Sequence, residues 1–216
     1  MNSKLKLGVL ISGRGSNLQS LIDATKKDDF AAEIVIVIAN VPNIMGLEIA
    51  KTANIPFKVI DHKKFNGREF FEQELHCALT EAKVDLVCLA GFMRILTDHF
   101  INLWLDKIIN IHPSLLPSFK GLNTHSRAIK SGTKFSGCTI HFVSPEVDAG
   151  PIIIQAVVAI KQDDTPDTLA RRILIEEHKI YPLAVQLIAS GNFLIEKDRV
   201  RLKNSVSPGI VLINPS

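Results

Sequence analysis

The sequence predicts a three-layer α/β protein with a mostly parallel sheet and an antiparallel C-terminal part. Short apolar runs rich in β-branched residues alternate with longer helical segments as far as about residue 131. That order is typical of a parallel sheet covered by helices on both faces. Beyond residue 131, two strand-like runs follow each other with only a short polar loop between them, which indicates an antiparallel pair.

The buried-strand pattern recurs through the first half of the chain. The expected strands are Leu5–Ile11, Glu33–Ala39, Phe57–Ile60, Val84–Ala90 and Lys107–Ile111, and the expected helices are Leu18–Lys26, Gly46–Ala53, Arg68–Glu81 and Asp98–Trp104. Right-handed crossovers bring the carboxyl ends of parallel strands to one edge of the sheet, so the loops that leave these strands should meet there. Ligands of open α/β sheets bind along that edge.

The second half of the chain predicts fewer and longer elements. They are strands Phe135–Val143 and Pro151–Ile160, a helix from Pro166 to Ser190 with a kink near Pro182, and a hairpin over Phe193–Leu202. Thr165 suits the N-cap of the helix and Pro166 its first position. The end of the chain should be loose. No internal repeat or linker divides the sequence, so we expect a single domain over residues 1–216.

Composition excludes several classes of protein. The chain has 216 residues, of which 46% are hydrophobic, which suffices for one sizeable core. Its net charge of +3 comes from scattered basic pairs without the stripe of a nucleic-acid-binding protein. Three widely spaced cysteines argue against a disulfide scaffold or a thiolate zinc site. With neither a leader pattern nor an apolar run of about 18 residues, we expect a cytoplasmic protein without membrane contact.

A glycine-rich loop, Ser12–Asn17, follows the first strand and opens a helix. Free N–H groups at such a helix start attract phosphate. Leu18 and Asn40 stand where a dinucleotide fingerprint requires a small residue and an acid, so NAD binding is disfavoured. Two interpretations remain open for this loop, a site for a smaller phosphate ester and a plain tight turn.

An amide and an imidazole lie two residues apart where the fifth strand meets a proline-rich loop. Alternation along the strand points Asn110 and His112 the same way. Pro113 and Pro117 stiffen the loop that follows. A hydrogen-bond donor beside a group that titrates near neutrality suits a reaction in which a carbonyl oxygen becomes negative and a proton moves. The alternative is a loop histidine bonded only to the backbone.

Further polar residues gather around the turn that contains Asp148. Thr139 and His141 share one face of the strand before it. An aspartate that bonds its own turn backbone is the alternative to a functional Asp148. Although histidines accompany it at 112, 125 and 141, the local spacing of zinc ligands is missing, so no metal is expected.

Two features indicate ligand contacts outside this turn. Glu177 has mostly apolar neighbours on the long helix, so its carboxylate needs either a substrate hydroxyl or amine or a structural hydrogen bond. The loop Gly91–Leu96 is unusually apolar, which favours either a pocket for a flat ligand or simple packing under the sheet edge.

Taken together, these segments resemble the folate-dependent glycinamide ribonucleotide formyltransferases of purine biosynthesis. The resemblance extends from the first strand to about Ser190. The segments that carry it are Gly13–Asn17, Ala90–Arg94, Asn110–Pro117, Gly121–His125, Asp148–Pro151, Glu177-His178 and Tyr181-Pro182. It implies the Rossmann-like formyltransferase fold, with a phosphate-binding half (1–110), a catalytic and folate-binding half (111–190) and a C-terminal tail (191–216).

The resemblance also implies the reaction and its partners. The amine of glycinamide ribonucleotide (GAR) would take the formyl group of 10-formyltetrahydrofolate, which gives formyl-GAR and tetrahydrofolate without a metal or a covalent nucleophile. Asn110 would donate a hydrogen bond to the oxyanion, His112 as imidazolium would add charge, and Asp148 would relay the proton. His125 would orient Asp148, with Thr139 and His141 as further supporting residues. Small molecules would be the partners of a monomer or homodimer, without nucleic acid.

Binding residues follow from the same resemblance. Gly15, Ser16 and Asn17 would cradle the GAR phosphate, and Glu177 would hold the ribose hydroxyls. The folate would be framed by Arg68, Met93, Arg94, Ile95 and Leu96, together with Asn110.

Three other functions compete with this one. A 10-formyltetrahydrofolate hydrolase would share the three catalytic residues, but we expect no room for an added regulatory domain before the first strand. A methionyl-tRNA formyltransferase would need a further domain and a basic surface. A non-catalytic folate- or phosphate-binding module would have no need for Asn110, His112 and Asp148 together.

Overall fold

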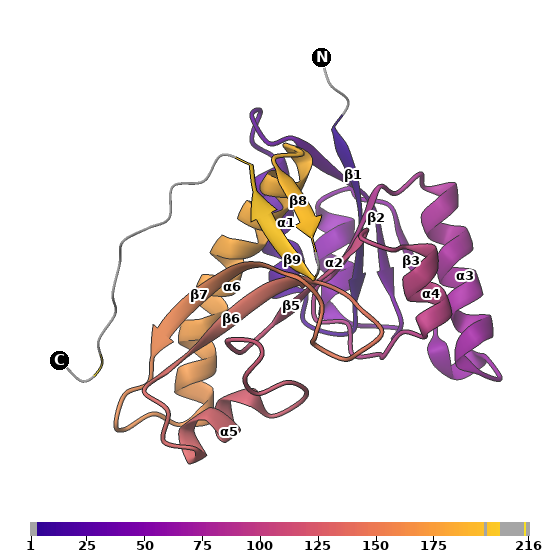
Figure 1. The fold of residues 1–216 in the computed structure, drawn as a ribbon. Coiled ribbons are helices and arrows are strands. Elements are labelled where there is room, and N and C mark those ends of the chain that lie inside the picture. The colour runs from indigo at the N-terminus through magenta and orange to yellow at the C-terminus, as the bar shows by residue number, and fades with distance from the viewer. Residues whose placement is uncertain (1–3, 197, 204–213, 215–216) are drawn as a thin grey trace.

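The computed structural model describes residues 4–196, 198–203 and 214. Within them, seven strands form one sheet in the order β3-β2-β1-β4-β5-β6-β7 (Figure 1). Their bounds are β1 Leu5–Ile11, β2 Ala32–Ala39, β3 Phe57–Val59, β4 Leu86–Leu89, β5 Ile108–His112, β6 Phe135–Phe142 and β7 Ile152–Ala159. Strands β1 to β5 pair in parallel, β6 is antiparallel to β5, and β7 is antiparallel to β6. The predicted mixed sheet is confirmed.

The helices match the prediction at both ends to within two residues. They are α1 Ser16–Thr25, α2 Met45–Thr52, α3 Arg68–Glu81, α4 Asp98–Leu103 and α6 Pro166–Ala189. Thr165 caps α6 as predicted, because its hydroxyl accepts from the Thr168 N–H, and the helix continues through Pro182. No helix in the described part of the chain is both long and apolar enough to span a bilayer.

Two short elements were not predicted, the helix α5 (Thr124–Lys130) and the 3-10 turn η1 (His62–Lys64). Helix α5 buries only Thr124 and Ala128, so it lacks the apolar stripe by which a helix is recognised in sequence. The predicted hairpin is confirmed as β8 (Phe193–Glu196) and β9 (Arg199–Leu202). Most of the tail predicted to be loose, residues 204–213, 215 and 216, lies outside the described residues.

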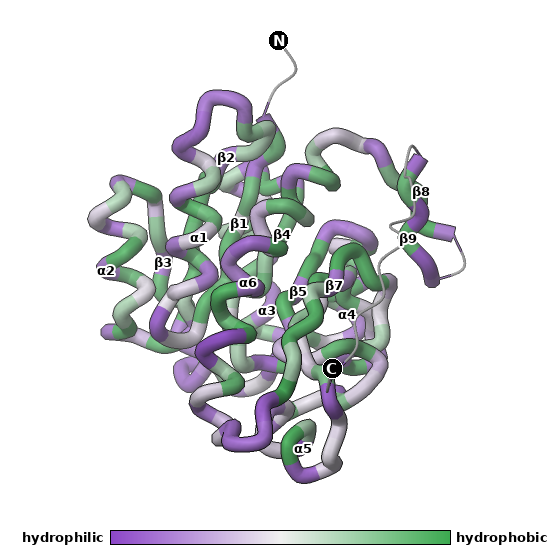
Figure 2. Tube along the Cα trace, turned by 90° about the vertical axis from the view of Figure 1, so that its left-hand side faces the viewer, coloured by the Kyte–Doolittle hydropathy of each residue, from purple (hydrophilic) through white to green (hydrophobic). Residues whose placement is uncertain are grey.

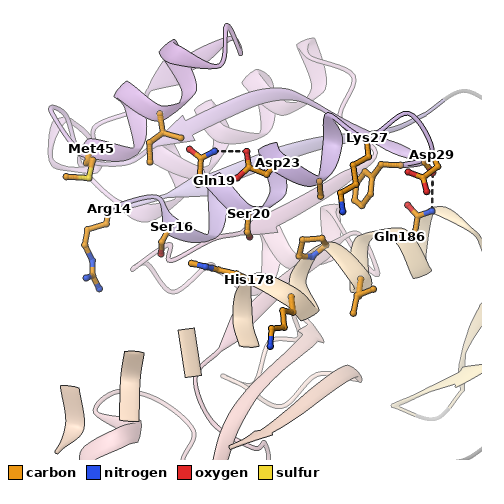
Figure 3. Close-up of a pocket in the computed structure, with 16 residues that line it drawn as sticks. Arg14, Ser16, Gln19, Ser20, Asp23, Lys27, Asp29, Met45, His178 and Gln186 are labelled. Atoms are coloured by element: carbon orange, nitrogen blue, oxygen red, sulfur yellow. Dashed lines mark hydrogen bonds between the residues drawn. The ribbon is translucent and has the colours of Figure 1, made fainter. Parts of the chain in front are cut away.

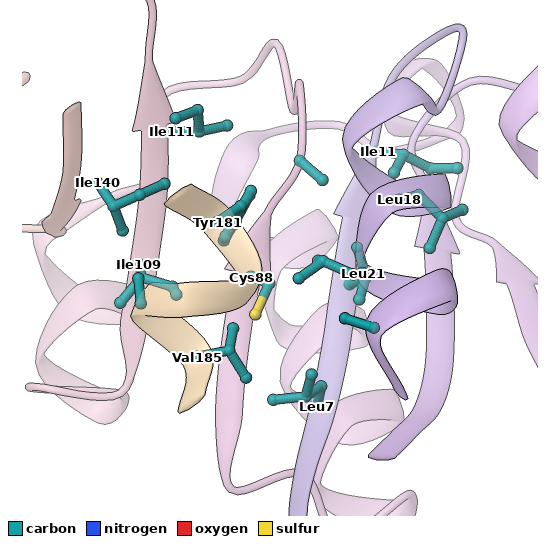
Figure 4. Close-up of a cluster of buried hydrophobic side chains, with 14 of the residues drawn as sticks. Leu7, Ile11, Leu18, Leu21, Cys88, Ile109, Ile111, Ile140, Tyr181 and Val185 are labelled. Atoms are coloured by element: carbon teal, nitrogen blue, oxygen red, sulfur yellow. The ribbon is translucent and has the colours of Figure 1, made fainter. Parts of the chain in front are cut away.

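Two hydrophobic clusters flank the sheet and make the three layers. Along β1, Leu7, Val9 and Ile11 enter the cluster shared with α1 and α6, whereas Leu10 enters the one shared with α3 and α4. Figure 4 shows α1 and α6 on either side of Cys88 in the first cluster. Apolar colour follows the strands and polar colour the outer turns in Figure 2. Each fully buried Leu or Ile contributes about 1.5–3 kcal/mol, so side chains that alternate along β1 stabilise the packing of helices on both of its faces.

The strand order reverses between β1 and β4, and this reversal marks the point on the sheet edge where a ligand is expected to bind. Strand β2 lies on one side of β1 and β4 on the other, so crossovers leave the sheet in opposite directions there. The loops after β1 and β4 meet at this point, where the Ser12 N–H donates to the Gly91 carbonyl over 3.2 Å. Such a switch point is the usual ligand site of an open α/β sheet.

Candidate active site

Pairing between β5 and β6 brings Asn110 opposite His141 and His112 opposite Thr139. The Nδ2 atom of Asn110 lies 3.2 Å from Nε2 of His141. The other ring nitrogen of His141, Nδ1, lies 2.8 Å from the Phe142 carbonyl, which can only accept. The proton of a neutral His141 therefore sits on Nδ1, and Nε2 accepts from Asn110. Burial lowers the pKa of His141, which favours this neutral form.

This contact uses one of the two amide hydrogens of Asn110. The Asn110 side chain makes no second hydrogen bond to the described residues, and it is only partly buried. Its remaining N–H is thus fixed in direction and open to a ligand. A preorganised donor of this kind stabilises a developing oxyanion without reorganising during the reaction.

The second part of the site is the pair of His112 and Asp148. The Nδ1 atom of His112 lies 3.4 Å from Oδ2 of Asp148, and both side chains are at most 10% exposed. The opposite ring nitrogen, Nε2, lies 3.1 Å from the Phe119 carbonyl. Since both nitrogens face oxygen acceptors, an imidazolium satisfies the geometry better than either neutral tautomer. The positive charge predicted for His112 therefore has partners on both sides.

Backbone geometry holds Asp148 in place. Its Oδ2 accepts a 2.8 Å hydrogen bond from the Gly121 N–H, and its Oδ1 lies 3.8 Å from Nε2 of His141. Asp148 has a φ of 52°, in the left-handed region. The turn then passes so close to β6 that a Cβ on Gly150 would lie 1.9 Å from the Phe142 carbonyl oxygen. The Gly121 contact was missed in the sequence, because a backbone donor has no side-chain signature.

His125 was expected to orient Asp148. The structure puts it at the start of α5, where burial and the neighbouring His112 lower the pKa of His125. Its Nε2 atom is buried without a hydrogen-bond partner among the described residues. Asp148 accepts from the Gly121 N–H and pairs with His112, and its Oδ1 lies 3.8 Å from Nε2 of the neutral His141. The orientation of Asp148 by His125 remains a prediction.

Thr139 fixes the loop that follows His112. Its hydroxyl donates to the Ser114 carbonyl over 2.7 Å and accepts from the Leu116 N–H over 3.1 Å. Gln155 of β7, which the sequence did not single out, donates to the same hydroxyl and to the Leu116 carbonyl. One donor and two acceptor positions are the full capacity of a hydroxyl, so Thr139 is satisfied.

The glycine-rich loop and the long helix form a second polar cluster. Gly15 has a φ of 78°, and a Cβ there would lie 2.7 Å from the Cα of Gly46 in α2, so only glycine fits. Gly15 is also the N-cap of α1 and provides no side-chain cap. The first N–H groups of α1 are therefore available to an anion.

Asn17 and Glu177 meet inside this cluster. The Asn17 Nδ2 donates a 2.7 Å hydrogen bond to Oε2 of Glu177, and both residues are buried. Burial raises the pKa of Glu177, and the hydrogen bond from Asn17 partly counters that rise. The Oδ1 atom of Asn17 is buried without a partner in the described part of the chain. Such an acceptor is costly unless a ligand donates to it.

A cleft of about 910 Å³ opens beside this cluster, between α1 and α6. Figure 3 shows Ser16 and Ser20 of α1 facing His178 of α6 across it. The Nε2 of His178 is buried without a partner among the described residues, and burial lowers the pKa of His178. His178 was not among the expected binding residues. The feature of the sequence that could have indicated it is its position next to Glu177 on α6.

The apolar loop after β4 divides its side chains between surface and core. Met93 and Ile95 are 69% and 59% exposed, whereas Leu96 packs inside the α3–α4 cluster. Leu96 was expected beside the folate, but its side chain belongs to the core. Arg68 is exposed at the first position of α3, and the Nε of Arg94 is buried without a partner in the described residues. The loop thus presents two apolar side chains at the ligand edge.

Across the residues that the structure describes, His, Cys, Asp and Glu side chains form no group of three or more that could hold a metal ion.

Known proteins resemble this chain along most of its length. The family model "Formyl transferase" matches residues 5–185. The human trifunctional purine biosynthetic protein adenosine-3 is 51% identical over 188 residues, which are 87% of this chain and 19% of that protein. The chain therefore spans about a fifth of the length of such trifunctional relatives. Phosphoribosylglycinamide formyltransferase of Haemophilus influenzae is 42% identical over 94% of this chain and 92% of its own length.

Solved structures agree with these relatives. Glycinamide ribonucleotide transformylase 1 of Symbiobacterium toebii superposes with a TM-score of 0.91 at 42% identity, covering 94% of this chain and 95% of its own. A formyltetrahydrofolate deformylase of Pseudomonas syringae has a TM-score of 0.86 at 26% identity, covering 93% of this chain and 66% of its own. With a family model matched over residues 5–185 and full-length relatives of the same kind, the chain belongs to the formyl transferase family.

Proposed function

We propose that this protein transfers the formyl group of 10-formyltetrahydrofolate to the amine of GAR, a step of purine biosynthesis. One observation carries the proposal. An Asn110 amide held by neutral His141 lies beside a His112–Asp148 ion pair, on the sheet edge that also holds the uncapped start of α1. Relatives named for this reaction match the chain over nearly their whole length.

The nucleotide would bind between the glycine-rich loop and α6. Its phosphate would accept from the N–H groups that follow Gly15, where the helix dipole favours negative charge. The ribose hydroxyls would donate to Glu177 and to the unpartnered Oδ1 of Asn17. The buried Nε2 of His178, which lines the cleft, would face the phosphate end of the same ligand.

The folate would lie along the loop after β4. Exposed Met93 and Ile95 offer apolar surface to a flat pterin ring, and Arg68 and Arg94 offer positive charge to the carboxylates of the folate tail. Leu96 would contribute through the backbone, since its side chain is in the core. Asn110 would reach the formyl group from β5.

The reaction then needs no covalent enzyme intermediate. The GAR amine attacks the formyl carbon, a C–N bond forms, and the carbonyl oxygen becomes an oxyanion that accepts from the free Asn110 N–H. The imidazolium of His112 adds positive charge nearby. Asp148 takes the proton lost by the amine and passes it to N10 of the folate as the old C–N bond breaks. The products are formyl-GAR and tetrahydrofolate.

A spectroscopic assay of 10-formyltetrahydrofolate with and without GAR tests the proposal. Deformylation that requires GAR, together with formyl-GAR detected by mass spectrometry, would support the transferase. The close superposition on a deformylase makes hydrolysis the second candidate, and it would release formate without GAR. Folate binding without turnover in either assay would instead indicate a binding module.

A further inference from the structure

Ser12 lies between the two loops to which the proposed function assigns the substrates. It directly precedes Gly13, so its backbone belongs to the glycine-rich loop. Its N–H donates to the Gly91 carbonyl over 3.2 Å, and its Oγ accepts from the Met93 N–H over 2.7 Å. A single part-buried serine thus joins the proposed phosphate loop to the start of the proposed folate loop at the switch point of the sheet.

Asn40 sets the direction of the Ser12 hydroxyl. Ser12 Oγ donates to Oδ1 of Asn40 over 2.6 Å, so its lone pairs are left to face Met93. Asn40 is only 1% exposed at the end of β2. Nδ1 of His62 lies 2.8 Å from the Asn40 carbonyl, which can only accept, so that nitrogen carries the proton and donates. His62 therefore holds the backbone of the residue whose side chain orients Ser12.

The opposite end of the folate loop has a separate anchor. The Glu72 carboxylate on α3 is 3% exposed and accepts from both the N–H and the hydroxyl of Thr97. Glu72 makes no hydrogen bond to the glycine-rich loop within the described residues. Of the two anchors, Ser12 alone connects the folate loop to the phosphate loop.

We propose that the Ser12–Asn40 pair is a positioning device that couples the binding of the two substrates. This inference rests on the proposed function. A phosphate bound to the N–H groups after Gly15 restrains the glycine-rich loop, and this restraint further stabilises the Ser12 hydroxyl, already oriented by Asn40, on which Met93 depends. The reciprocal effect follows by linkage, because a factor by which GAR improves folate binding must equal the factor by which folate improves GAR binding.

Calorimetric titration with tetrahydrofolate tests the coupling, with and without saturating GAR. This pair cannot react, because no formyl group is present. In the wild-type protein, GAR should lower the Kd of tetrahydrofolate. In Ser12→Ala, the Kd for tetrahydrofolate alone should rise about five-fold, as expected for one lost hydrogen bond, and GAR should no longer change it. The affinity for GAR alone should stay within about two-fold, and the KM for formyl-folate should rise more than kcat falls.

Two variants serve as controls. Glu72→Gln loosens the other anchor, so it should weaken tetrahydrofolate binding and leave the GAR effect intact. Ser131→Ala removes a hydroxyl that bonds the Ala128 carbonyl at the end of α5, and it should change neither quantity. If Ser12→Ala fails to fold, Ser12→Cys replaces it with the same expectation, because a thiol is a poor acceptor.

The outcomes separate the inference from the function on which it rests. A wild-type GAR effect that persists in Ser12→Ala or Ser12→Cys would overturn the coupling, and so would its absence from the wild-type protein. A wild-type protein that binds neither tetrahydrofolate nor GAR and transfers no formyl group would instead overturn the proposed function.

Discussion

Asn17 donates a 2.7 Å hydrogen bond from Nδ2 to Oε2 of Glu177, across 160 residues of sequence. The contact joins the first turn of α1 to the middle of α6 and buries an acidic group between them. Burying a carboxyl group in this way lowers the stability of the fold. A protein retains such a group where a ligand later binds to it.

Replacing Glu177 with Gln should therefore improve stability and impair nucleotide binding. Folding raises the pKa of Glu177. Its contribution to the free energy of unfolding is therefore favourable below the ordinary carboxyl pKa of about 4.3 and is lost as the pH rises. Measured by urea unfolding, the free energy of unfolding of Glu177→Gln relative to the wild type should be higher at pH 8 than at pH 4. The KM for GAR should rise about ten-fold. A gain in stability confined to pH 4 would contradict this account.

Removing the oxyanion donor should affect chemistry far more than binding. Asn110→Ala is expected to lower kcat by about 10²–10³, equivalent to about 3 kcal/mol, because the lost hydrogen bond is strongest in the transition state. Steady-state kinetics would measure this, with tetrahydrofolate affinity as the control. A variant with normal kcat and raised KM would assign Asn110 to substrate binding only.

His141 should act through Asn110. The neutral ring accepts from the Asn110 amide, so His141→Ala frees that amide to rotate and should lower kcat about ten-fold. In the Asn110→Ala background the same substitution should cost little, since the group it orients is already gone. Equal losses of kcat in both backgrounds would show that His141 acts independently of Asn110.

Thr139→Val tests the loop after His112. The substitution keeps the shape of the side chain but leaves the Leu116 N–H without its acceptor and the Gln155 amide with one of its two acceptors. The free energy of unfolding should fall by about 2–3 kcal/mol, measured in urea, and kcat should fall with it. Thr133→Val is the matched control, because Thr133 is exposed and its hydroxyl only donates to a carbonyl, and it should change stability by less than about 0.5 kcal/mol.

An ion pair at the start of α6 should make stability depend on acid pH. Arg172 holds the pKa of Asp164 well below its usual range, through hydrogen bonds from both terminal nitrogens. The stabilisation is therefore present above the ordinary pKa of about 3.9 and lost as pH falls below it. Asp164→Asn should lower the free energy of unfolding by about 2 kcal/mol at pH 7 and by less at pH 3. A constant difference across that range would reject this role.

Much of the fold could be predicted because it depends on short-range patterns. The apolar run Leu5–Ile11 encodes a strand buried on both faces, and Thr165 with Pro166 encodes the start of α6. The crossover rule then brings the loops after β1, β4 and β5 to one edge, and alternation turns Asn110 and His112 the same way. Helix α5 was not predicted, because it buries too few apolar residues to show a helical pattern in the sequence.

The sequence by itself determined the class of fold, the edge at which the polar motifs gather and the residue types of the reaction. Only the tertiary structure decided which groups meet. It paired Asn17 with Glu177, assigned the proton of His141, put the Gly121 N–H on Asp148, connected Ser12 to Met93 and buried Leu96. These contacts depend on strand register, on packing across many residues and on backbone donors. None of these has a periodic signature, whereas the apolar and polar faces of a strand or helix do.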